Sequence, residues 1–195
     1  MDIASISHKH TNMYIIGNDG RYVLYDCLWH DSAPIIKSAL KEKEISFSQI
    51  ELLFTSHFHP DHGGSFSFLQ QNGVAPMVLD VQIPHIEWLN SFFSKQKNDP
   101  SNRFIPIGIN AINPVNASQA TDALRSCGID GFVLHTPGHS EDSISLVIGD
   151  AAFVGDLPPY ETAEGYAGSV AASWQSIIAK GAKQLYYAHA NTLYL

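Results

Sequence analysis

The 195-residue chain is poor in cysteine, in charge and in long apolar runs. Its two cysteines, Cys27 and Cys127, are too few for a disulfide framework or a cysteine-based zinc cluster, and their apolar neighbours predict buried thiols. No run approaches the roughly 18 apolar residues of a membrane-spanning helix. Residues 1–12 contain no apolar stretch of the signal-peptide type. We therefore expect a cytoplasmic protein with no membrane partner.

Positive charge is also scarce. Lys and Arg number 11 against 19 Asp and Glu, which gives a net charge of −8, and charged residues make up only 15% of the chain. A nucleic-acid-binding surface needs clustered basic side chains. The composition therefore argues against a nucleic-acid partner and favours a small-molecule substrate.

Strand and helix signals alternate along the chain, with no repeat or linker between them. A turn signal at residues 17–20 separates two apolar runs and predicts a hairpin. We expect strands at 13–16, 21–25, 50–55, 76–79, 131–135, 144–148, 152–154 and 185–187. We expect helices beginning at residue 34 and spanning 65–71, 84–95 and 170–179, and irregular chain at 98–118. This mixture predicts one α/β or α+β domain over residues 1–195.

Histidine is the residue type that stands out, with 10 copies, and four metal-capable side chains crowd residues 55–64 (TSHFHPDHGG). His57 and His59 point the same way if the preceding strand continues, so both can hold one ion. Asp61 and His62 follow after a proline has turned the chain, and they can face a second ion. Imidazole with carboxylate suits zinc, iron and similar metals. The motif therefore predicts a metal site.

Three further candidate ligands each follow a predicted strand. His139 lies in the loop sequence TPGHS, Asp156 ends the run FVGD, and His189 follows the run LYYA. Each is ambiguous alone, but together they repeat one arrangement, a ligand on the loop that leaves a strand. Scaffolds commonly present functional groups on such loops.

In order and spacing, these motifs resemble the metallo-β-lactamase superfamily, metal-dependent hydrolases with a four-layer αββα sandwich fold. The resemblance runs from the first hairpin to His189, and it implies two neighbouring divalent ions that activate a water molecule. Zinc is the default ion, and iron or manganese also fits. By this resemblance, His57, His59 and His139 hold the first ion, Asp61, His62 and His189 hold the second, Asp156 bridges the two, and Asp26 supports the histidine motif.

A bridging aspartate resembles the glyoxalase II-like branch of the family. Only residues 190–195 follow the last ligand, so we expect a compact form without a glutathione-binding domain. Lactonases of this fold carry a tyrosine three positions after the bridging aspartate. Here Pro159 stands there and Tyr160 is next, which makes Tyr160 a candidate acid for the leaving group. The resemblance implies hydrolysis of a small ester, thioester or lactone, with Asp61, Asp156 and Tyr160 as catalytic residues.

Other functions of the same fold stay open: a mononuclear iron enzyme that oxidises a persulfide, a phosphodiesterase, and a non-catalytic sensor. Residues 98–118 contain Arg103 as their single basic residue, unlike the basic insertion of RNA-processing members. Specificity is expected in loops 26–34, 98–118 and 157–168. The aromatic residues Trp29, Phe92 and Phe93 are better explained by packing than by substrate contact, and His8, His10, His30 and His85 by structural roles.

Overall fold

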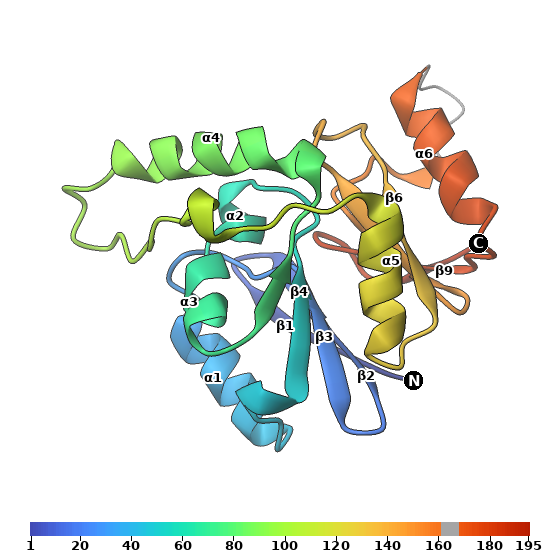
Figure 1. Ribbon diagram of the computed structural model, residues 1–195, viewed down its shortest axis with the longest axis horizontal. Helices are drawn as coiled ribbons and strands as arrows, with labels where there is room; N and C mark the ends of the chain where they lie inside the picture. The colour runs from blue at the N-terminus through green and yellow to red at the C-terminus, as the bar shows by residue number, and fades with distance from the viewer. Residues whose placement is uncertain (161–167) are drawn as a thin grey trace.

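The computed structural model describes residues 1–160 and 168–195, and two five-stranded sheets form its centre (Figure 1). The first sheet, in spatial order, contains β1 (Asp2–His8), β2 (Thr11–Asn18), β3 (Arg21–Tyr25), β4 (Ile50–Phe54) and β5 (Ala75–Met77). The second sheet, in spatial order, contains β10 (Leu193–Tyr194), β9 (Gln184–Tyr187), β8 (Ala151–Gly155), β7 (Ile144–Ile148) and β6 (Gly131–His135). The α-helices are α1 (Ala33–Glu42), α2 (Pro60–Gly63), α3 (Phe66–Gln71), α4 (Ile83–Ser94), α5 (Ala117–Ser126) and α6 (Ser169–Ile178).

Each sheet combines antiparallel and parallel pairing. In the first sheet β1, β2 and β3 are antiparallel, and β4 and β5 then join in parallel. In the second sheet β6, β7 and β8 are antiparallel, and β9 pairs with β8 in parallel. Parallel neighbours end at the same edge of a sheet. The loops after β3 and β4 therefore leave together, as do the loops after β8 and β9.

The alternation of side chains along each strand separates the layers. In β2, Tyr14 and Ile16 belong to the apolar cluster between the sheets, whereas Met13 and Ile15 belong to the cluster under α1, α3 and α4. A third cluster packs Trp174 and its neighbours on α6 against the outer face of the second sheet. Figure 1 shows α1, α3 and α4 on one side and α6 on the other, with α5 alongside β6. The expected αββα sandwich is confirmed.

The strands and helices expected from the sequence are present with small shifts at their ends, but β1, α2, α5 and β10 were not predicted. The stretch 98–118 was expected to be irregular, which is wrong at its end because α5 begins at Ala117. The Asn116 side chain accepts a hydrogen bond from the backbone N–H of Gln119, and the Gln119 side chain caps the Asn116 N–H in return. This capping box stabilises the start of a helix even though the segment is rich in polar residues.

The structure can be compared with two expectations, which rest on the low cysteine content and on the lack of long apolar runs. Cys27 and Cys127 are free and buried, as predicted. Across residues 1–160 and 168–195, none of the helices combines the length and the apolar character required to cross a bilayer.

Candidate metal centre

The seven predicted ligands come from loops at one edge of the two sheets, and the structure brings all seven together. His57, His59, Asp61 and His62 follow β4, where His59 is the N-cap of the short helix α2. The other three ligands, His139, Asp156 and His189, lie in the loop after β6, at the end of β8 and just beyond β9. The shared edge of the parallel pairs thus places residues distant in sequence around one point.

Three imidazoles form the first group. The Nε2 atom of His57 lies 3.0 Å from Nδ1 of His59, and Nε2 of His139 lies 3.1 Å from the same Nδ1 atom. His57 is fully buried, whereas His139 lies closer to the surface. These three convergent imidazole nitrogens form a donor set that one metal ion could use.

Asp61, His62 and His189 form the second group. The Oδ2 atom of Asp61 lies 3.6 Å from Nε2 of His62 and 3.2 Å from Nε2 of His189. These three atoms are close enough for a single ion to reach all of them. One carboxylate and two imidazoles suit zinc, iron or manganese.

Asp156 lies between the two groups. Its Oδ2 atom is 3.5 Å from Nε2 of His139 and 4.0 Å from Nε2 of His57. Its Oδ1 atom is 3.4 Å from Nε2 of His62 and 3.2 Å from Nε2 of His189. One carboxylate oxygen therefore faces each group, which is the geometry that a bridging ligand requires.

Two buried atoms at the centre of this arrangement indicate that it suits a metal. Nε2 of His62 and Oδ1 of Asp156 make no hydrogen bond to any described residue. Leaving a buried polar atom without a partner costs about 1–3 kcal/mol, so such atoms are rare in folded proteins. His62 and Asp156 form, with His57, a group whose ligand atoms lie within 4.8 Å of one another, and this donor set fits a cation.

Charge is concentrated in the same place. The neighbouring carboxylates of Asp156 and Asp61 raise the pKa of His189 to about 11. Burial lowers the pKa of His62, but Asp26 and Asp156 outweigh it and raise that pKa to about 10. Burial raises the pKa of Asp156, but His189 and His62 hold it well below its usual range. Metal ligands bind in the deprotonated form, so an ion bound by His62 and His189 would displace any proton on their Nε2 atoms.

Neighbouring polar groups orient the ligands. The fully buried Asp26 accepts hydrogen bonds from the Ser56 backbone N–H at 2.7 Å and from Nδ1 of His62 at 2.9 Å. Nδ1 of His189 donates to the His10 carbonyl oxygen at 2.7 Å, and Thr11 Oγ1 donates to Oδ2 of Asp61 at 3.0 Å. Such contacts fix the tautomer of a ligating histidine and the direction of its ring.

Asp142 joins two of the ligand loops. The side chain is 1% exposed, and its Oδ2 atom accepts the backbone N–H of Phe58 at 2.8 Å. Its Oδ1 atom accepts the Ser140 hydroxyl and lies 3.3 Å from Nδ1 of His85. Phe58 lies between His57 and His59, and Ser140 follows His139, so one carboxylate ties the loops of all three first-group histidines.

An open pocket of about 280 Å³ lies against the site, lined by His139, Gly155, Asp156, Leu157, Pro159, Tyr187, His189 and Ala190. The Tyr160 ring packs edge-on against Trp174 with 5.4 Å between ring centroids, and its backbone N–H donates to the Tyr187 hydroxyl. Tyr160 is not among the pocket-lining residues, and its role as an acid stays a prediction. Within the predicted specificity loop 157–168, residues 161–167 lie outside the described part of the chain.

One aromatic residue beside the site was missed. The Trp88 ring lies 5.7 Å from the His59 ring between centroids, and Trp88 is 49% exposed. Its position on the helix of residues 84–95 was predictable from the sequence, but the approach of that helix to the histidine motif was not.

The profile of the metallo-beta-lactamase superfamily matches residues 8–189. The chain belongs to this superfamily. A hydroxyacylglutathione hydrolase of Xanthomonas campestris is 29% identical over 142 residues, which cover 73% of this chain and 44% of the relative. A beta-lactamase hydrolase-like protein of Xylella fastidiosa is 29% identical over 133 residues, which cover 66% of this chain and 29% of the relative. The chain thus spans less than half the length of these curated relatives.

A solved structure shows the fold that the superfamily shares. The beta-lactamase of Chitinophaga pinensis superposes with a TM-score of 0.71 at 19% sequence identity, covering 96% of this chain and 75% of that chain. At that identity the likeness concerns the fold alone.

Proposed function

We propose that this chain is a hydrolase of a small ester, thioester or lactone that works with two metal ions held side by side. The observation that carries the proposal is Asp156, whose two oxygens face two separate groups of ligand atoms. The hydroxyacylglutathione hydrolase among the relatives supports an acyl substrate.

Each of the seven residues has a part in this proposal. The first ion would be held by His57, His59 and His139, and the second by Asp61, His62 and His189. Zinc is the ion we propose, and the same donors suit iron or manganese. Two bound divalent ions supply a water of lowered pKa and polarise the substrate carbonyl.

The protein groups position and steer the reactants. Asp156 holds the two groups at a fixed separation. The Asp61 carboxylate is oriented by its hydrogen bond from Thr11, and we assign it the steering of the proton of the attacking water. For the leaving group we assign Tyr160 as the proton donor.

The substrate class follows from size and charge. A pocket of about 280 Å³ suits a small molecule, and a net charge of −8 repels a polyanion. We therefore propose a small acyl substrate, with no nucleic-acid or membrane partner, in a cytoplasmic protein.

Metal analysis combined with a substrate panel tests the proposal. The metal-replete protein should hold two ions per chain and hydrolyse at least one of p-nitrophenyl acetate, an acyl thioester and an acyl lactone. His57→Ala should lose both metal and hydrolysis, whereas His8→Ala, outside the ligand groups, should retain them. Cleavage of bis-p-nitrophenyl phosphate or RNA without acyl hydrolysis would favour a phosphodiesterase. One iron per chain after anaerobic purification, with oxygen consumption on a persulfide, would favour the oxygenase.

A further inference from the structure

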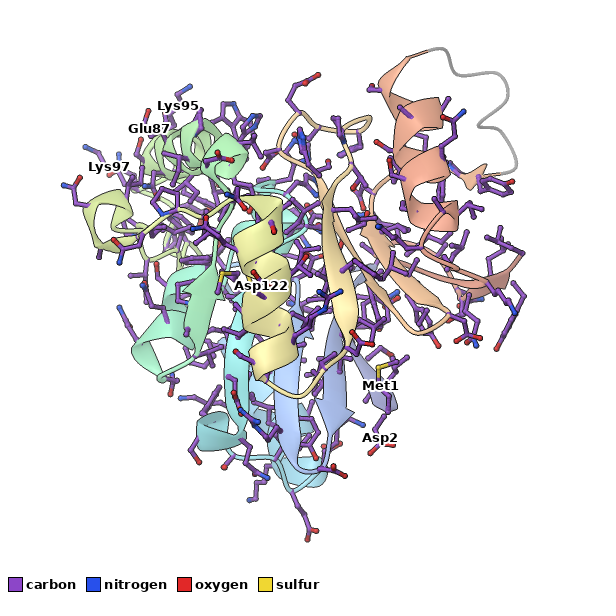
Figure 2. The ribbon with its side chains drawn as sticks, turned by 45° about the vertical axis from the view of Figure 1, so that its right-hand side comes forward. Met1, Asp2, Glu87, Lys95, Lys97 and Asp122 are labelled. Carbon is purple, nitrogen blue, oxygen red and sulfur yellow. The ribbon has the colours of Figure 1, made fainter. Side chains whose placement is uncertain are left out.

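Helix α4 presents two different stripes of side chains. Ile86, Leu89 and Phe93 are buried in the cluster that packs on the first sheet. A neighbouring stripe contains His85, Trp88 and Phe92, which share a face because they are three and four residues apart. Figure 2 shows the charged side chains of Glu87, Lys95 and Lys97 projecting from the outside of the helix and the segment that follows it. The His85–Trp88–Phe92 stripe therefore lies between the core and the charged surface.

This stripe is tied to the metal centre at two points. Nδ1 of His85 lies 3.3 Å from Oδ1 of Asp142, the carboxylate that also receives the backbone N–H of Phe58. One turn further along the helix, the Trp88 ring lies 5.7 Å from the His59 ring, with an angle of 52° between their planes. These two contacts fix the position of α4 relative to the histidine loop. They place Trp88 directly beside the candidate ligand His59.

The Trp88 ring packs against a neighbouring ring although half of the residue is exposed. Its ring stacks on Phe92 with 5.5 Å between centroids and 24° between planes, and Phe92 also makes an edge contact with Phe93 in the core. An indole that is 49% exposed leaves a broad apolar face in water. An apolar face beside a few convergent polar groups is typical of a small-molecule site.

We propose that Trp88, supported by Phe92, binds the acyl chain of the substrate and determines a preference for longer acyl groups. The inference rests on the proposed acyl hydrolysis. An acyl chain begins at the carbonyl carbon that must reach the metals, so its first methylene groups have to pass the ligands. Trp88 offers an uncharged surface at that point, next to His59.

Chain length is the variable that tests this contact. Burying one methylene group completely contributes about 0.8 kcal/mol, which is about fourfold in affinity. A one-sided contact with an indole face should give about half of that free energy, or about twofold for each added methylene. The contact is present in the ground state and the transition state alike, so it should lower KM and leave kcat unchanged.

The experiment has a kinetic arm and a binding arm. The kinetic arm compares p-nitrophenyl acetate, butanoate, hexanoate and octanoate. The binding arm measures the dissociation constants of the four free carboxylates for the metal-loaded protein by calorimetry, which does not require turnover. Trp88→Ala is compared with Trp88→Phe, which keeps a flat ring, and with Tyr194→Ala, which removes a 73% exposed aromatic side chain on β10.

In the wild-type protein and in Tyr194→Ala, octanoate, which has six more methylene groups than acetate, should bind about 10- to 60-fold more tightly, according to whether about half or all of these groups contact the indole. Trp88→Ala should reduce this ratio to about two or less, and Trp88→Phe should restore part of it. Equal binding of acetate and octanoate by the wild type, or an unchanged ratio in Trp88→Ala, overturns the inference. If no ester is hydrolysed while the carboxylate ratio depends on Trp88, the proposed hydrolysis fails and the acyl-binding role stands.

Discussion

Asp156 is the single residue on which both groups of ligands depend, because each of its oxygens faces a different group. Asp156→Asn keeps the shape of the side chain and removes its negative charge. We expect the second metal equivalent to bind at least about tenfold more weakly and hydrolysis to fall by about 100-fold, while the fold is retained. Metal titration, circular dichroism and substrate kinetics check this. Two ions bound with wild-type affinity would show that Asp156 is not the bridge.

Asp142 belongs to neither ligand group but supports the loops of the first group, because its carboxylate accepts hydrogen bonds from the backbone N–H of Phe58 and from the Ser140 hydroxyl. Asp142→Asn should weaken metal binding at the first group by about tenfold, because the loops that carry His57, His59 and His139 lose a shared charged acceptor. The second group has other supports, so its affinity should change less. Competition with a chelating dye resolves the two sites.

A suitable control for Asp142 is Asp80→Asn. Asp80 is an exposed residue of the 3-10 turn before α4, and its carboxylate accepts the neighbouring backbone N–H of Val81. Equal effects of the two substitutions on metal affinity would contradict the role of Asp142.

Among the elements, the short helix α2 depends on a close approach of backbone at its end. A Cβ atom added to Gly64 would meet the His30 nitrogen, and would lie 2.5 Å from the Pro60 oxygen and 2.6 Å from the Trp29 carbonyl carbon. Backbone atoms cannot rotate away, so Gly64→Ala should lower the free energy of unfolding by about 2–3 kcal/mol and displace His62. Urea unfolding and metal titration measure the two effects.

Gly108→Ala is the matched control, because a Cβ atom there meets nothing within 4 Å. It should change the free energy of unfolding by less than about 0.5 kcal/mol. A Gly64→Ala protein as stable as this control would show that the loop at residues 29–30 can move aside.

The sequence predicts strands best where apolar residues cluster. It predicts them less well where a polar segment becomes a strand only through pairing with a neighbouring strand. β1 was missed because only Ile6 of its seven residues is buried, and its polar sequence is stabilised by pairing with β2. By contrast, α5 carried a readable signal, Asn116 followed three residues later by Gln119, and its polar composition hid it. β10 has two residues, which is too short for any periodic pattern.

The candidate site was predictable for a different reason. The order and spacing of the histidine and aspartate motifs resemble those of the superfamily, and this resemblance predicts the candidate ligands without knowledge of the sheets. No sequence pattern identifies the residues that support or flank the ligands. The contacts of His85 and Trp88 with Asp142 and His59 depend on how α4 crosses the site, and that is set by the packing of Ile86, Leu89 and Phe93.

For the whole molecule, the three apolar clusters predict that the fold does not depend on metal. Removing metal with a chelator should leave the far-ultraviolet circular dichroism unchanged. An ion present at 100 to 1,000 times its dissociation constant stabilises the folded state by about 3–4 kcal/mol, so the Tm should fall by roughly 5–15 °C. Differential scanning calorimetry with and without added zinc tests this. An unfolded apoprotein would contradict it.

The contact between the first hairpin and His189, the last candidate ligand, bears on the order in which the ligand set is completed during synthesis. Asn12 donates its backbone N–H to the Ala188 carbonyl at 2.8 Å, and His189 donates to the His10 carbonyl, so the segment after β9 latches onto the turn between β1 and β2. A ribosome releases His57, His59, Asp61 and His62 long before it releases His189. The nascent protein therefore passes through a stage in which the set of candidate ligands is incomplete. Under the proposed metal binding, all seven ligands would be in place only after His189 has been released and has bound to this turn.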